Sequence, residues 1–330
     1  MTARRLVLRA GLSLGALIAA EGLLRLLPIP ALMPPVAPAR LEPYLMFGYV
    51  PLDPAYRAVG METRRPAFGE ALPAKAPGEV RVVVLGGSVA YGTGAGRRER
   101  CWDLRLEGRL PKGWRVVNRA RPSYNSTQCL VSLALEALDD EADWIVLVDG
   151  FNDLAVPLVM GGKPGDPYYL PALREQMQGG LWREIRWHSR ILQGLSALWP
   201  PPSVKRRALA PEEASEVRRI AARNLRQMGA LLSARGVKGL LVAEPVSCGK
   251  PMSPEEKAHF DTLVWGEALR REYPPLVSAE LEAARGSGWK VLDATGLFAE
   301  VPQTRFTDSV HPNDAGQEAL AERIAAELAP

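Results

Sequence analysis

A glycine-rich turn with a single serine follows the first strongly β-branched run of the chain. Residues 82–88 read V-V-V-L-G-G-S, which places Gly86, Gly87 and Ser88 directly after an expected strand. Such a turn exposes the serine hydroxyl, but a hydroxyl is a poor nucleophile unless a neighbouring base takes its proton and a third group orients that base. A base and an orienting acid must therefore come from elsewhere in the chain.

His311 is the best candidate for the base. The chain contains three histidines. His188 lies in an aromatic-rich segment and His259 in a charged helical segment, and both are expected to be packing or surface residues. His311 follows Asp308 by three residues, in a loop that ends at a proline just before the last expected helix. One loop can therefore present a carboxylate to an imidazole, which predicts a catalytic triad with Ser88.

The same turn does not match the phosphate-binding loops. A dinucleotide-binding G-x-G-x-x-G pattern that starts at Gly86 would need glycines where the chain has Ser88 and Tyr91. A P-loop would need lysine where Thr93 stands. The G-x-S-x-G pattern of α/β-hydrolases fails only at Ala90, but the acid and histidine of that fold normally come from separate loops. A nucleophile is therefore favoured over a phosphate cradle, and no cofactor or metal is implied.

The candidate residues lie in loops between expected strands and helices. Apolar runs typical of parallel strands buried on both faces occur at 80–85, 114–118, 143–148, 237–243 and 289–293. Helical patterns occur at about 101–110, 126–138, 212–235, 254–285 and 314–328. This alternation predicts an α/β three-layer sandwich with a five-stranded, mostly parallel, doubly wound and flavodoxin-like sheet over residues 79–330. Sites of such sheets form at the carboxyl ends of the strands.

Taken in order, the loops resemble the sequence blocks of the SGNH (GDSL-type) hydrolase superfamily. The first block, Gly-Asp-Ser, is similar to Gly86–Ser88, and the second has the position and length of Asn118–Ser123. The third block, Gly-x-Asn-Asp, matches Gly150–Asp153, and the fifth, Asp-x-x-His-Pro, matches Asp308–Pro312. The resemblance covers roughly residues 79–330. A Gly-Gly-Ser turn with a proline-rich arm also resembles a membrane-anchored bacterial subgroup.

This resemblance implies a role for each matched residue. Ser88 would attack the acyl carbon, His311 would act first as base and then as acid, and Asp308 would orient His311. The oxyanion would be held by the backbone N–H of Ser88, a backbone N–H at Ser123 and the side-chain amide of Asn152. The residues that would support the site are Gly86, Gly87, Gly150 and Asp153.

The implied activity is that of a serine esterase or acylhydrolase, which cleaves an acyl ester such as an acetyl ester at the cell envelope. Two alternatives stay open. An O-acyltransferase acting on an envelope glycan would use the same residues, and a non-catalytic envelope scaffold could be built on the same fold.

Two features depart from the family pattern. Gly87 replaces the usual aspartate, and Ser123 stands where the family normally has its oxyanion glycine. Arg119 and Arg121 are also unusual in the second block. They are interpreted either as solvated surface residues or as ligands for an anionic group of the substrate.

The first 27 residues have the composition of an export signal. Arg4, Arg5 and Arg9 precede an uncharged apolar stretch, and residues 6–27 would extend roughly 33 Å as a helix, enough to cross a bilayer. We expect an uncleaved signal anchor or transmembrane helix over 1–27, with the catalytic domain periplasmic or extracellular. An amphipathic helix on the domain surface is the alternative.

Composition restricts the partners. The formal net charge is +4, and all of the excess positive charge lies before residue 79. The main domain therefore has no net field to attract a polyanion, and no nucleic-acid partner is expected. The expected partners are a small-molecule, lipid or glycan acyl ester and, through the N-terminal helix, a membrane.

Three further segments or residues are open to more than one interpretation. Residues 28–78 are rich in proline and are expected to form a linker arm without long helices or central strands. The insertion at about 154–211 is rich in aromatic residues and is expected to be a helical decoration, a lid beside the serine or a surface that rests on lipid. The three cysteines match no metal motif and are expected to be buried thiols, although one disulfide is compatible with export.

Overall fold

The structure is a computed structural model, and it describes residues 3–26, 39–40, 48–49, 70–170, 189–192 and 205–328. The described residues fall into two compact units. One unit contains residues 3–26 and 189–192, and the other contains the remaining described residues.

The larger unit is built on a five-stranded sheet. Its strands are β3 (Val80–Gly86), β4 (Trp114–Asn118), β5 (Trp144–Asp149), β6 (Lys238–Ala243) and β7 (Lys290–Asp293). They are arranged in the order β4-β3-β5-β6-β7, and every neighbouring pair is parallel. The α/β fold with a doubly wound parallel sheet is therefore confirmed, and each strand begins within one residue of its predicted start.

The central strands are buried on both faces, as their continuous apolar sequences predict. Val82 and Val84 point into a core with helices on one face, while Val83 and Leu85, on the opposite face, are also fully or almost fully buried. Apolar burial of this kind contributes about 25 cal/mol per Å² of surface removed from water. The sheet is therefore a rigid base for the loops at its carboxyl edge.

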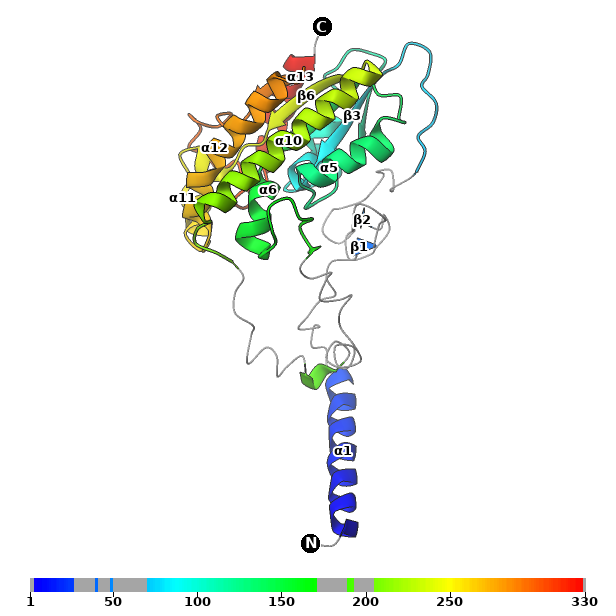
Figure 1. Ribbon diagram of the computed structural model, residues 1–330, viewed down its shortest axis with the longest axis vertical. Helices are drawn as coiled ribbons and strands as arrows, with labels where there is room; N and C mark the ends of the chain where they lie inside the picture. The colour runs from blue at the N-terminus through cyan, green and yellow to red at the C-terminus, as the bar shows by residue number, and fades with distance from the viewer. Residues whose placement is uncertain are drawn as a thin grey trace. The chain divides into compact units, whose positions relative to one another are not determined.

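Helices cover both faces of the sheet. The longer helices are α4 (Trp102–Glu107), α5 (Ser126–Ser132), α10 (Pro211–Arg235), α11 (Pro254–Phe260), α12 (Gly266–Arg285) and α13 (Asp314–Leu328). Helices α5, α10 and α12 lie side by side on one face (Figure 1), and α4 and α13 pack against each other on the other face. The three-layer arrangement is therefore as predicted.

Shorter elements complete the unit. Two short helices directly follow strands: α3 (Ser88–Tyr91) comes after β3, and α6 (Phe151–Ala155) comes after β5. Two π-helical turns, η2 (Leu133–Ala137) and η3 (Val156–Met160), extend α5 and α6. Two 3₁₀ turns are η1 (Arg98–Arg100) and η4 (Ser247–Gly249), and β1 (Ala39–Arg40) pairs antiparallel with β2 (Gly48–Tyr49).

The single helix predicted over 254–285 is wrong, because the chain breaks it into α11 and α12. Ser253 caps α11 and forms a capping box with Glu256, and the helix ends at Phe260. Gly266 begins α12 so close to the ring of Phe260 that a Cβ there would lie 3.0 Å from it. The apolar period continues through the break, so periodicity alone did not reveal it.

The smaller unit contains helix α1 (Ala3–Leu26). Glu21 on this helix forms an ion pair with Arg25 and accepts hydrogen bonds from the segment 189–192. Within the described part of the chain, no helix combines the length and the apolar character needed to cross a membrane. The transmembrane helix expected over residues 1–27 is therefore not supported.

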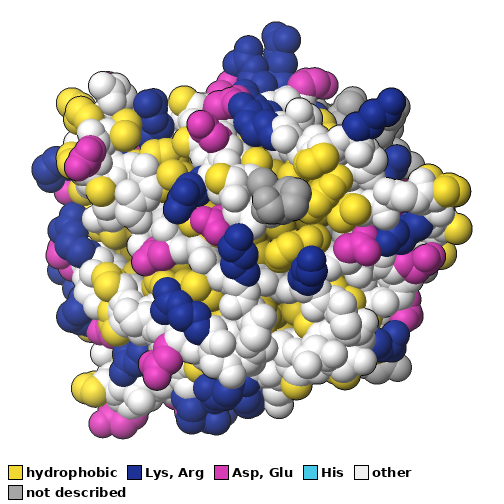
Figure 2. Space-filling model, turned by 90° about the horizontal axis from the view of Figure 1, so that it is seen from above, with side chains coloured by type: hydrophobic (Ala, Val, Ile, Leu, Met, Phe, Trp, Pro, Cys, Tyr) yellow, Lys and Arg dark blue, Asp and Glu magenta, His cyan; other side chains and the backbone are white. Residues whose placement is uncertain are grey.

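Charged side chains of both signs lie on the surface of the molecule (Figure 2). On the face seen in Figure 2, basic and acidic side chains are interspersed. Cys101 and Cys129 are buried thiols, Cys248 is half-buried, and none of the three forms a disulfide.

Candidate active site

The turn after β3 mounts Ser88 at the carboxyl edge of the sheet. Gly86 has a φ of 140°, and a Cβ there would overlap the carbonyl oxygen of Val148 on the neighbouring strand. Only glycine can adopt this conformation in so little space. Ser88 is the first residue of α3, so its backbone N–H has no acceptor within the helix and is available to an oxyanion.

The structure brings Ser88, His311 and Asp308 together in a continuous hydrogen-bonded chain. The Oγ of Ser88 lies 2.7 Å from Nε2 of His311, although the two residues are 223 positions apart. Nδ1 of His311 lies 2.6 Å from Oδ2 of Asp308. The imidazole is 20% exposed, so substrate and water can reach it. This arrangement has the geometry needed for a serine nucleophile, a general base and an orienting acid.

Asp308 is held as a carboxylate. Its Oδ1 accepts hydrogen bonds from the backbone N–H groups of Val310 (2.8 Å) and His311 (2.9 Å). Burial raises the pKa of Asp308, but the hydrogen bond and charge of His311 and the two N–H groups outweigh burial and leave the pKa below its usual value. The carboxylate can therefore fix the imidazole with Nε2 towards the serine.

Asn152 projects from α6 towards the same turn. Its side chain is buried, and its Nδ2 donates one hydrogen bond of 2.7 Å to the carbonyl oxygen of Tyr124. An amide nitrogen carries two hydrogens, so a second donor remains for an oxyanion. Gly87 lies against this amide, which has room only because residue 87 has no Cβ.

Ser123 adopts a backbone conformation that favours glycine. Its φ is 68°, in the left-handed region that non-glycine residues rarely occupy. Its hydroxyl donates a hydrogen bond of 3.3 Å to the hydroxyl of Tyr169. Tyr169 belongs to the first part of the 154–211 insertion, so this part reaches the second loop. The three tryptophans of the insertion lie outside the described residues.

The predicted supporting residues hold the third loop. Gly150 has a φ of 140°, and a Cβ there would lie 2.8 Å from the hydroxyl oxygen of Tyr273. Asp153 is buried and accepts hydrogen bonds from the backbone N–H (2.9 Å) and hydroxyl (2.7 Å) of Ser126 at the start of α5. Burial raises the pKa of Asp153 to about 6, although both hydrogen bonds oppose that rise.

Sequence reasoning missed Glu244. This buried residue follows β6, and its carboxyl oxygen accepts a hydrogen bond of 2.7 Å from the N–H of Phe151, next to Asn152. Burial raises the pKa of Glu244 to about 7, against the opposing effects of the Phe151 N–H and the charge of His311. The only available signal was its position directly after a buried strand, at the edge where sites form.

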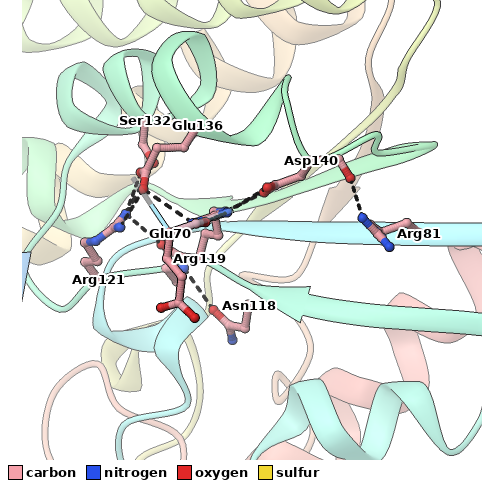
Figure 3. A network of polar contacts seen from close by, with 9 residues as sticks. Glu70, Arg81, Asn118, Arg119, Arg121, Ser132, Glu136 and Asp140 are labelled. Carbon is pink, nitrogen blue, oxygen red and sulfur yellow. Dashed lines mark hydrogen bonds and ion pairs between the residues drawn. The ribbon is translucent and has the colours of Figure 1, made fainter. Parts of the chain in front are cut away.

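Both interpretations of Arg119 and Arg121 are wrong. The side chains are neither solvated nor turned towards a ligand but are buried and paired with Glu136 and Asp140 (Figure 3). Two cations and two anions can lie together in the interior because they compensate one another. No anion site exists at these two residues.

The other candidates in the described chain are not part of this site. His259 is an exposed residue of α11, and His188 lies outside the described residues. Among the side chains that the structure describes, no group of three or more His, Cys, Asp or Glu is arranged to hold a metal ion.

A model of the GDSL-like lipase/acylhydrolase family matches residues 84–319, a range that contains all four loops of the site. The chain belongs to this family. Membership makes it a hydrolase of ester bonds, an esterase or acylhydrolase. A comparison with curated proteins finds no match.

Several solved structures are weakly similar to this family member. An acetyl xylan esterase, AlAXEase, is 12% identical with a TM-score of 0.47, and the match covers 76% of this chain and 100% of that one. An acetylxylan esterase from Geobacillus stearothermophilus is 16% identical with a TM-score of 0.46, over 75% and 93% of the two chains. A lipolytic protein of the G-D-S-L family from Desulfitobacterium hafniense DCB-2 is 12% identical with a TM-score of 0.44, over 76% and 100%.

Proposed function

We propose that the protein hydrolyses an acyl ester by a Ser-His-Asp mechanism in which Ser88 is the nucleophile. The observation that carries the proposal is the hydrogen-bonded chain from Ser88 Oγ through the His311 imidazole to Asp308. Each member has the partner that its role requires, because a hydroxyl needs a base and an imidazole needs an orienting group.

In the proposed reaction, Nε2 of His311 takes the proton of Ser88 while Oγ attacks the acyl carbon. The imidazolium then gives this proton to the leaving alcohol oxygen, and the acyl group stays on Ser88. Water, deprotonated by His311, attacks the acyl-enzyme, and the imidazolium returns this proton to Oγ of Ser88 as the acid is released. Asp308 stabilises the imidazolium in both halves.

The developing oxyanion would accept hydrogen bonds from the N–H of Ser88, the N–H of Ser123 and the Nδ2 of Asn152. Two observations support this assignment: the Ser88 N–H has no intrahelical acceptor, and Asn152 Nδ2 carries a hydrogen beyond the one given to Tyr124. Removing one such donor typically lowers kcat by about 10²–10³.

The test is turnover of p-nitrophenyl acetate, butyrate and octanoate by wild type, Ser88→Ala and His311→Ala. Both variants should lose activity to a similar extent, because the two residues act as a unit. A parallel reaction with an acceptor sugar separates hydrolysis from transfer: free acid supports a hydrolase, and acylated sugar supports a transferase. Wild-type turnover in Ser88→Ala would contradict the mechanism.

We also propose that the catalytic domain acts outside the cytoplasm, at the cell envelope. This proposal rests on the three arginines before the apolar stretch of the first 27 residues. A reporter fused after Pro330 that is active only on the outer side of the membrane is the expected result. Activity confined to the cytoplasm would contradict it.

A further inference from the structure

We infer that the buried ion pair between Arg121 and Glu136 is a positioning element of the oxyanion hole. The inference rests on the proposed function, because it concerns the loop that would supply the second backbone donor. It assigns these two residues the task of holding Ser123 in a conformation that a glycine would adopt without help.

The pair belongs to a network of polar contacts next to the second loop (Figure 3). The guanidinium of Arg121 donates two hydrogen bonds of 2.9 Å, one to each carboxylate oxygen of Glu136. Ser132 adds a third donor to Glu136 at 2.7 Å. Arg121 is 6% exposed and Glu136 4%, so the two-pronged geometry is fixed and little screened by solvent.

The backbone of Arg121 is tied directly to the nucleophile turn. Its N–H donates a hydrogen bond of 3.0 Å to the carbonyl oxygen of Gly86, two residues before Ser88. Its carbonyl oxygen accepts a hydrogen bond of 3.1 Å from the N–H of Tyr124, which closes a turn around Ser123. Arg121 therefore joins the buried pair to both the serine turn and the second loop.

The far side of the turn is tied to the third loop. The carbonyl oxygen of Tyr124 accepts from the side-chain amide of Asn152, and the ring of Tyr124 lies under the Arg121 guanidinium at 5.7 Å. All three proposed oxyanion donors thus connect through the four residues from Arg121 to Tyr124. A displacement of the Arg121 backbone would directly move the donors of the serine turn and of the second loop.

The left-handed conformation of Ser123 explains why such an anchor is needed. A non-glycine residue in this region costs about 1–2 kcal/mol and persists only where the surroundings over-determine it. Two residues that precede Ser123 are also held in place. The side-chain oxygen of Asn118 accepts a hydrogen bond from the backbone N–H of Ala120, and Arg119 is paired with Asp140. The strained residue is therefore enclosed by anchored neighbours.

Arg119 makes a selective experiment possible. It is bound to Asp140 through two nitrogens, so it keeps a close counterion when Glu136 is changed. In the double variant Arg121→Met/Glu136→Met, both members of the first pair are removed together and no buried charge is left alone. Replacing a buried ion pair by apolar residues of similar volume is often neutral or stabilising.

The experiment compares kcat, KM and Tm for four forms: wild type, Arg121→Lys, Glu136→Gln and the double methionine variant. We expect kcat to fall about 10–100-fold in Arg121→Lys and in the double variant, with KM changed less than about threefold, because a misplacement near 1 Å can cost 10² in rate. Lysine retains the charge but not the two parallel hydrogen bonds. The Tm of the double variant should lie within a few degrees of the wild-type Tm, while its kcat stays low.

The control is Arg81→Met/Glu79→Met, which removes an ion pair between a buried arginine and a half-buried glutamate at the opposite end of β3. Arg81 also donates to the backbone carbonyl oxygen of Asp140, so this control disturbs the same network but keeps the Arg121–Glu136 pair. It should leave kcat unchanged. If the double variant at 121 and 136 recovers kcat together with Tm, or if Arg121→Lys has wild-type kcat, the pair has only a packing role and the inference fails. Ser88→Ala is measured alongside: if it retains activity, the proposed function fails, whatever the other variants do.

Discussion

The side-chain amide of Asn152 occupies the space that a Cβ of residue 87 would need. A Cβ built on Gly87 would overlap Nδ2 of Asn152 and lie 2.9 Å from the carbonyl oxygen of Tyr124. The glycine that replaces the family's usual aspartate is therefore a requirement of this site, because it lets the third loop approach the serine turn closely.

Gly87→Ala should accordingly lower kcat about 10–100-fold with little change in KM. The added methyl group displaces the Asn152 amide, and an oxyanion donor stabilises the transition state more than the bound substrate. Gly87→Asp should lose at least as much, even though it restores the family residue. Gly296→Ala is the matched control, since a Cβ there meets nothing within 4 Å. Wild-type kcat in Gly87→Ala would mean that Asn152 does not contribute through this position.

Ser123→Gly should retain the kcat of wild type on an acetyl ester and raise the relative rate on longer acyl chains. The backbone N–H persists, the left-handed strain is relieved, and a Cβ and hydroxyl are removed from the loop. Ser123→Ala, which keeps the Cβ, should not broaden the acyl range. A fall of about 10²–10³ in kcat in both variants would show instead that the hydroxyl is itself an oxyanion donor.

A control for this strain is available in the same chain. Glu141 is the other described non-glycine residue with positive φ, at 54°, and it is exposed. Glu141→Gly should relieve strain in the same way without changing the acyl range. A matching change in acyl range would assign the effect of Ser123→Gly to global loosening.

Glu244 should make folding stability fall as pH rises from about 5 to 7. Burial raises its pKa from 4.5 to about 7, so the folded state holds this proton more tightly than the unfolded state does. The contribution is fully present below the unfolded pKa and is lost as pH rises through the folded pKa. At about 1.4 kcal/mol per pKa unit, the loss is roughly 3 kcal/mol.

Glu244→Gln removes this titration and keeps an oxygen that can accept from the Phe151 N–H. Urea unfolding at pH 5 and pH 7.5 should show a decline in the free energy of unfolding that is smaller than in wild type by roughly 2 kcal/mol. Asp153 titrates nearby, so some decline persists. The exposed residue Glu282, changed to Gln, should leave the decline as in wild type. An equal decline in all three forms would remove Glu244 as its cause.

Much of the fold followed from local patterns. Strands buried on both faces have continuous apolar sequences, and parallel strands place their following loops at one edge, so Ser88, Asn152 and the Asp308–His311 loop could be expected near one another. The distances between these side chains could not be predicted, because they depend on how the strands are ordered and twisted in space.

The pairing of buried charges from different segments of the chain was not visible in the sequence. Glu136 lies on the segment predicted as an ordinary helix and Asp140 lies two residues after it, so nothing marked these two acids as partners of Arg119 and Arg121 in the preceding loop. The break after Phe260 was hidden in the same way, because the residues on both sides keep a helical period. The close packing of Gly87 on Asn152 likewise depends on two loops more than 60 residues apart in the chain.

The most direct test of the central claim is covalent labelling by a fluorophosphonate. The reagent phosphonylates an activated serine and places its oxygen in the oxyanion hole, so it reports the nucleophile, the base and the donors together. We expect one label per chain, mapped by mass spectrometry to Ser88, absent in Ser88→Ala and much slower in His311→Ala. A label on another residue, or wild-type protein that hydrolyses esters without any label on Ser88, would contradict the account.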